Sequence, residues 1–99
     1  MIYHLVERQT WAEVSGEAGE PYVGVPGPEG FVHCCDDRQV QHVRAGFFPP
    51  DAQVVALALD PTLLDVETRY EPGVGGENER FPHVFGPIAR SAVLRVIEL

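Results

Sequence analysis

The sequence predicts an α+β fold: one compact domain over residues 1–99, in which an antiparallel or mixed, split β-sheet carries two or three short helices. A chain of 99 residues has the size of a domain with one core. Its hydrophobic fraction of 44% is typical of a globular protein. The late strand patterns follow one another without long helices between them, which disfavours a doubly wound parallel sheet. We therefore expect the helices to gather on one side of the sheet.

The first elements alternate between strand and helix. Residues 2–6 are β-branched and aromatic, as in a strand. Thr10 and Glu13 have the spacing of a capping box, which predicts a helix from there to about residue 16. The Gly- and Pro-rich stretch 16–30 then predicts a long connection, with a short extended piece at residues 22–23.

A strand and a second helix are predicted in the middle of the chain. Residues 31–34 form the strand, and Asp36 is a candidate N-cap with Gln39 at the third helical position. Gly46 is the expected end of the helix. The apolar stripe of this helix consists of Val40, Val43 and Phe47. His42 falls away from that stripe.

The second half of the chain predicts strands. Residues 54–59 are uniformly apolar, which indicates a central strand covered on both faces. Residues 60–64 predict a turn of helix, and the alternation in 66–70 predicts a half-exposed strand. The Gly-rich and acidic stretch 71–80 is interpreted as a loop, and residues 92–99 as the last strand.

Composition narrows the classes of partner. Fifteen acidic residues against seven arginines and no lysine give a net charge of −8, so that we expect no binding to nucleic acid or to anionic membranes. We find no signal-peptide pattern and no long apolar span, and we expect a cytoplasmic protein. Cys34 and Cys35 are sequence neighbours, too close for an ordinary disulfide.

Familiar catalytic motifs are absent, and three histidines stand out instead. The glycines of residues 73–76 do not open a helix, so they do not predict a dinucleotide site. His4, His33 and His83 each lie in or beside a predicted strand, where pairing could bring the imidazoles together. Imidazole suits proton transfer, hydrogen bonding to a ribose hydroxyl, or metal ligation.

Other side chains could join this histidine set. Glu71 and Glu79 flank elements that must pack, and we take them as candidate catalytic carboxylates. Zinc bound by the histidines with Cys34 is an alternative, although the spacing is not diagnostic and we assign no metal ligands. For each histidine, a structural role in the core remains an alternative.

Three segments resemble one known family along nearly the whole chain: residues 2–5, residues 30–34, and the aromatic-Pro-His-x-aromatic-Gly-Pro string of residues 81–87. They are similar to the domain of unknown function 952 family of small bacterial proteins. The resemblance implies an α+β fold of the ADP-ribosyltransferase type. By that analogy it also implies binding of NAD or ADP-ribose, or glycosyl transfer.

The resemblance also implies roles for individual residues. His4 would hold the ribose of NAD, His33 with Cys34 would support the site, and Glu71 or Glu79 would polarise the ribose. Arg69 or Arg80 could meet the pyrophosphate. Two hypotheses about the function stay open: a nucleotide-directed enzyme or binder, and a non-catalytic module that contacts a protein partner.

Overall fold

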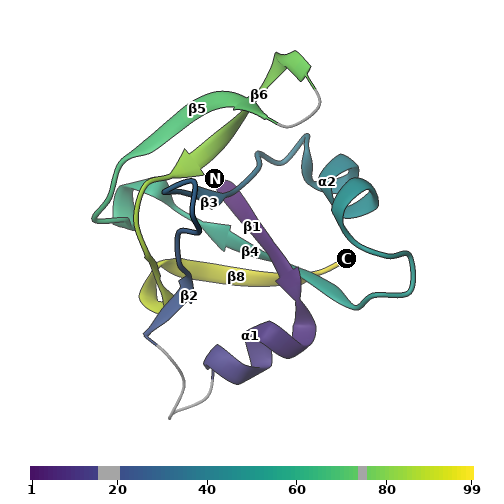
Figure 1. Cartoon of the computed structure of the whole chain (residues 1–99). Coiled ribbons are helices and arrows are strands. Elements are labelled where there is room, and N and C mark those ends of the chain that lie inside the picture. The colour runs from purple at the N-terminus through teal and green to yellow at the C-terminus, as the bar shows by residue number, and fades with distance from the viewer. Residues whose placement is uncertain (16–20, 74–75) are drawn as a thin grey trace.

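The structure, a computed structural model, describes residues 1–15, 21–73 and 76–99. At its centre lies an antiparallel sheet of three strands in the order β1-β4-β8 (Figure 1). These strands are β1 (Ile2–Glu7), β4 (Val54–Leu59) and β8 (Val93–Glu98). All six residues of β4 are buried, which confirms the predicted central strand.

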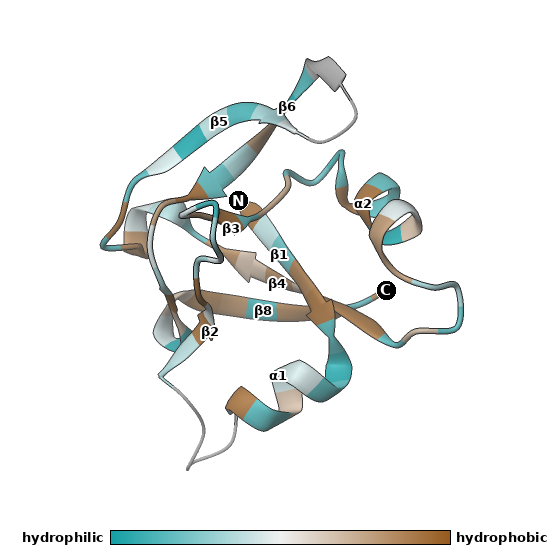
Figure 2. Ribbon diagram, in the orientation of Figure 1, coloured by the Kyte–Doolittle hydropathy of each residue, from teal (hydrophilic) through white to brown (hydrophobic). Residues whose placement is uncertain are grey.

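Side chains alternate along β4 between two apolar clusters, one on each face of the sheet. Leu57 belongs to the first cluster and Ala56 to the second. Helix α1 (Arg8–Ser15) packs Trp11 on the first cluster, and helix α2 (Val40–Phe47) packs Val43 on the second. The expectation that the helices share one side is therefore wrong, because both faces of β4 are apolar and each requires a cover. Figure 2 shows the apolar residues concentrated on these central strands.

The remaining strands form two smaller antiparallel sheets. One has three strands in the order β3-β6-β5, namely β3 (Val32–His33), β6 (Gly76–Val84) and β5 (Thr68–Gly73). The other pairs β2 (Tyr22–Gly24) with β7 (Ile88–Ala89). Every strand pair of the described residues is antiparallel, which confirms the α+β class and the split sheet.

The stretch 71–80, predicted as a loop, is mostly part of a β-hairpin. Strand β5 pairs with β6 from the Thr68–Val84 pair to the Gly73–Gly76 pair. Glycine and acidic residues are depleted in strands, so the composition of residues 71–80 predicted a loop and not a hairpin. Pairing with β6 overrides that local preference. Residues 74 and 75 of the predicted glycine turn lie outside the described residues.

Helix ends also differ from the prediction. Helix α1 begins at Arg8, directly after β1, so Thr10 lies inside the helix and the capping box was wrongly placed. The end predicted near residue 16 lies outside the described residues. Helix α2 continues through Gly46 to Phe47.

The Asp36–Gln39 prediction is confirmed as a local structure but not as a helix start. Asp36 Oδ1 accepts a hydrogen bond from the backbone N–H of Gln39, and Gln39 Oε1 accepts one from the backbone N–H of Asp36. This reciprocal pair closes a turn, and α2 begins only at Val40. The described residues also form two 3₁₀ helices, at Pro61–Leu63, as predicted, and at Arg90–Ala92. In the described part of the chain, no helix is long and apolar enough to cross a membrane.

Candidate functional site

The site is built around a hydrogen bond between two predicted residues, Glu71 of β5 and His83 of β6. Glu71 pairs with Phe81 and Arg69 pairs with His83, and residues two apart on a strand share a face. The register therefore places Glu71 diagonally opposite His83 on one face of the sheet. His83 Nδ1 lies 2.9 Å from Glu71 Oε1. Because an ionised carboxylate only accepts hydrogen bonds, Nδ1 carries a proton in this contact.

The other ring nitrogen of His83 is buried without a partner. The residue is only 4% exposed, and its ring stacks on Phe31 with 3.9 Å between the centroids. Among the residues that the structure describes, nothing forms a hydrogen bond with Nε2. An unsatisfied buried polar group typically costs about 1–3 kcal/mol. Such groups in native proteins often mark a functional position.

His4 presents a second imidazole of defined orientation. Its Nδ1 donates to the backbone carbonyl of His33 at 2.8 Å, since a carbonyl oxygen can only accept. In the neutral ring, Nε2 is then an acceptor. Burial lowers the pKa of His4, against the opposing effect of the bond to His33, and thereby favours the neutral form. Gly24 lies against this ring, and a Cβ there would stand 3.3 Å from His4 Nε2.

His33 is the exposed member of the set. Its side chain is 60% exposed, and its Nε2 lies 3.9 Å from Glu29 Oε1. His33 pairs with His83 between β3 and β6, and their ring centroids are 5.5 Å apart. The rings of His33 and Phe31 are inclined to each other, edge to face, with their centroids 4.8 Å apart. Strand pairing therefore brings His33 and His83 together, whereas β1, which carries His4, pairs with β4.

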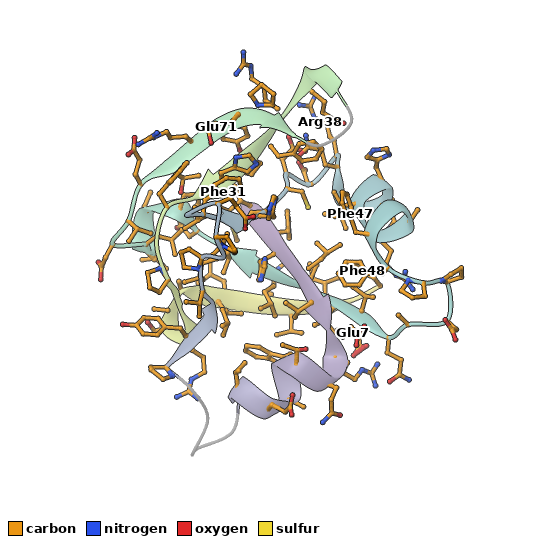
Figure 3. The ribbon with its side chains drawn as sticks, viewed as in Figure 1. Glu7, Phe31, Arg38, Phe47, Phe48 and Glu71 are labelled. Atoms are coloured by element: carbon orange, nitrogen blue, oxygen red, sulfur yellow. The ribbon has the colours of Figure 1, made fainter. Side chains whose placement is uncertain are left out.

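The three histidines line one pocket of about 350 Å³ between β1, α2 and the β3-β6-β5 sheet. Most of its wall is apolar or aromatic. Figure 3 shows Phe31 and Glu71 on the side of that sheet, and Phe47 and Phe48 on the side of α2. The side chains that line the pocket with the histidines include Tyr3, Leu5, Val43, Phe47, Phe48 and Phe81.

Both cysteines line the pocket as well, but their thiols face different clusters. Cys34 belongs to the first apolar cluster and Cys35 to the second, and both are free. Burial, with the neighbouring Cys35 as a smaller contribution, raises the pKa of the Cys34 thiol. Burial and the charge of Asp36 raise the pKa of Cys35 to about 12. Both groups are therefore protonated thiols and poor nucleophiles at neutral pH.

Two predicted residues lie in a different hollow. Glu79 and Arg80 line a second, more polar space of about 560 Å³ with Asp36, Arg38, Gln39 and Tyr70. The buried Gln39 amide donates there to Glu79 Oε2 at 3.3 Å and to the Arg80 carbonyl at 2.8 Å. Gln39 Oε1 also accepts a hydrogen bond from the backbone N–H of Asp36, so both polar atoms of the Gln39 side chain have partners. These hydrogen bonds give the polar residues of the hollow a structural role.

Arg69 lies on the same sheet face as His83 but beyond Phe31. Its guanidinium carbon stands 4.4 Å above the Phe85 ring, and Nη2 donates to Glu67 Oε1 at 2.9 Å. Phe85 lies 5.4 Å from Phe31, which in turn stacks on His83. Arg69 thus belongs to the aromatic surface beside the pocket.

Sequence reasoning missed most of the aromatic wall. Phe31 stands two residues before His33, so the alternation of a strand could have placed both on one face. Phe47 was assigned to the apolar stripe of α2, yet it is 63% exposed and lines the pocket with the exposed His42. The zinc alternative finds no support: no group of three or more His, Cys, Asp or Glu residues in the described ranges is placed to hold a metal ion.

Comparisons place the chain among proteins of similar fold. Residues 5–96 match the family described as "Protein of unknown function (DUF952)". The crystal structure of protein CC0527 from Caulobacter crescentus is 28% identical, with a TM-score of 0.78, and the alignment covers 99% of this chain and 84% of that one. A double methionine mutant of that protein gives 27% identity, the same TM-score and the same coverage of both chains. No curated protein matches the chain.

Proposed function

The chain belongs to the DUF952 family, whose description assigns no activity, and we propose from the site itself that the histidine pocket binds the ring end of a nucleotide such as NAD or ADP-ribose. The observation that carries this proposal is that His83 lines the pocket while its buried Nε2 has no hydrogen-bond partner among the described residues. A ligand that donates a hydrogen bond to this nitrogen would remove the cost of its burial.

The size and lining of the pocket support a planar ligand. A volume of about 350 Å³ is near the lower end of the range of small-molecule sites, about 300–1,000 Å³. Aromatic walls around a few fixed polar groups are typical of such sites. We propose that the ring enters the pocket and that the phosphates stay outside, where the half-exposed Arg69 on the same sheet face would meet them.

The His83–Glu71 pair also suits proton transfer. A histidine oriented by a carboxylate at Nδ1 can take a proton at Nε2, and the carboxylate then stabilises the imidazolium. Glycosyl transfer from NAD is the reaction that the resemblance to ADP-ribosyltransferases implies. In that reaction the bond between ribose C1 and the nicotinamide nitrogen breaks, nicotinamide leaves, and the hydroxyl of water or of an acceptor bonds to C1. We assign His83 the role of the base that takes the proton of that hydroxyl, with His4 and His33 among the residues that line the same pocket.

Isothermal titration with NAD and with ADP-ribose tests the proposal. We expect saturable heat with the native protein and its loss in His83→Phe, which keeps a planar ring over Phe31 but removes both ring nitrogens. Gln41→Ala, a change at an exposed residue of α2 outside the pocket lining, is the matched control and should still bind. Absence of heat and of a thermal shift at millimolar NAD and ADP-ribose would refute the proposal. Release of nicotinamide from NAD, followed by chromatography, then separates an enzyme from a binder.

A further inference from the structure

Two imidazoles among the residues that line the pocket, His83 and His4, have matching proton positions. In His83, Nδ1 is committed to the Glu71 carboxylate, and in His4, Nδ1 is committed to the His33 carbonyl. Both partners are acceptors, so in each neutral ring the proton sits on Nδ1 and Nε2 carries a lone pair. The fold therefore fixes both Nε2 atoms as hydrogen-bond acceptors, whereas either nitrogen of a free neutral imidazole can donate or accept.

The electrostatic surroundings agree with this polarity. The lining of the pocket, as far as the described residues define it, contains no lysine or arginine. The Glu71 carboxylate lies directly behind His83, and the whole chain carries a net charge of −8. An anionic group inside the pocket would meet acceptors and negative charge without a cation to pair with it. A neutral hydrogen-bond donor needs no cation to pair with it, and it can bond to the acceptors of the pocket.

We infer that the pocket selects a ring that carries no negative charge and bears an O–H or N–H donor, and that it rejects both anionic rings and rings that can only accept hydrogen bonds. This inference rests on the proposed function, because it specifies which chemistry the ring end of the ligand must carry. It also separates the two parts of a nucleotide: the base or ribose hydroxyls enter, and phosphate is excluded from the pocket.

Two aromatic residues of the pocket, Phe47 and Phe81, would position the selected ring. Phe47 is 63% exposed at the end of α2 although it lines the pocket, so its ring face is available to a ligand. Phe81 lies on the same sheet face as His83. A planar ligand between these walls would direct its donor toward the buried Nε2 of His83.

Three matched probes test the inference: phenol as the neutral donor, anisole as its methyl-capped analogue without a donor, and benzoate as the anion. Each is titrated into ¹⁵N-labelled protein, with the imidazole signals of His4 and His83 and the amide of Phe47 followed by NMR. We expect phenol to bind about tenfold or more tightly than anisole or benzoate, and to shift the His83 Nε2 signal.

Two variants identify the acceptor. His83→Phe should bind phenol and anisole alike, because the nitrogen is gone while the ring space is kept. Glu71→Gln keeps the shape of the side chain but can donate to Nδ1, which lets the His83 proton move to Nε2, and the preference for phenol should fall. Gln41→Ala, a change at an exposed residue of α2 outside the pocket lining, should keep the preference of the native protein.

The outcomes separate the two proposals. Equal binding of phenol and anisole by the native protein would overturn the donor selection and leave ring binding in place. Tighter binding of benzoate would also overturn it. If no probe shifts any signal of the pocket at millimolar concentration, both the selection and the proposed ring binding are overturned. Loss of the phenol preference in both variants at His83 and Glu71 supports the inference.

Discussion

Glu71 and His83 are held 2.9 Å apart, between Oε1 and Nδ1, by the register of two adjacent strands. The carboxylate is 37% exposed while the imidazole is 5% exposed, so a solvated charge orients a buried base. The contact fixes the proton of the neutral His83 ring on Nδ1 and leaves Nε2 as an acceptor in the pocket.

Removal of the carboxylate should destabilise the fold because His83 Nδ1 then loses its acceptor in a buried environment. We expect Glu71→Ala to lower the free energy of unfolding by about 1–3 kcal/mol, measured by urea denaturation. Glu67→Ala is the matched control, since its solvent-exposed ion pair with Arg69 should contribute little to stability. Equal losses in the two variants would argue against a buried Glu71–His83 bond.

Acidification should destabilise the protein through His4. Its pKa is lowered in the folded state from the ordinary value of 6.5, so the unfolded chain binds the proton more readily. Stability from this group is present above pH 6.5 and is lost as the pH falls below that value. In His4→Asn, whose amide can still donate to the His33 carbonyl, the free energy of unfolding should depend less on pH between about 7.5 and 5.5. An unchanged pH dependence would contradict this account of His4.

The two thiols should be unreactive in the folded protein. Burial raises the pKa of Cys35 to about 12, and burial also raises the pKa of Cys34, so thiolate is scarce at pH 8. We expect a thiol reagent such as Ellman's reagent to label neither cysteine in native buffer and both in guanidinium chloride. Fast labelling of the native protein at either position would show that the thiol is accessible and ionised.

Arg44 should support the wall of the pocket that carries Phe48. Its guanidinium donates to backbone carbonyls after α2, among them Pro49 at 3.1 Å and Ala52 at 2.8 Å. We expect Arg44→Ala to lower the free energy of unfolding by about 1–3 kcal/mol, because bonds from a charged donor are lost. Arg38→Ala, a change at an arginine whose side chain is 88% exposed, should have little effect. Similar effects of the two changes would speak against this role.

The sequence predicts the central elements of the fold well because burial shapes their pattern. The uniformly apolar residues 54–59 could only be a covered strand, and β4 is fully buried. The hairpin of β5 and β6 was missed because its glycines and acidic residues are poor strand formers locally, and only pairing across the sheet stabilises them. Local patterns also misplaced the helix starts. The capping pattern predicted that the first helix begins at Thr10, whereas β1 continues directly into α1 at Arg8.

The histidines of the candidate site could be selected from the sequence, but the contacts around them could not. His4, His33 and His83 could be chosen from the sequence, and all three line one pocket. Glu71 could not be preferred over Glu79 without the register, which brings Glu71 to His83 and directs Glu79 to Gln39. The aromatic wall depends on contacts between distant segments, such as Phe31 on His83, that no local pattern specifies.

The central claim is that the buried Nε2 of His83 anchors a ligand in the pocket. The most direct measurement follows the ¹⁵N signal of this nitrogen while NAD or adenosine is added to the native protein. We predict a saturable shift of His83 Nε2 that follows the same binding curve as the Phe47 amide. In His83→Phe, we predict no saturable shift of the Phe47 amide on addition of the same ligand. Binding that leaves the His83 Nε2 signal unchanged, or no binding of either compound at millimolar concentration, would contradict the claim.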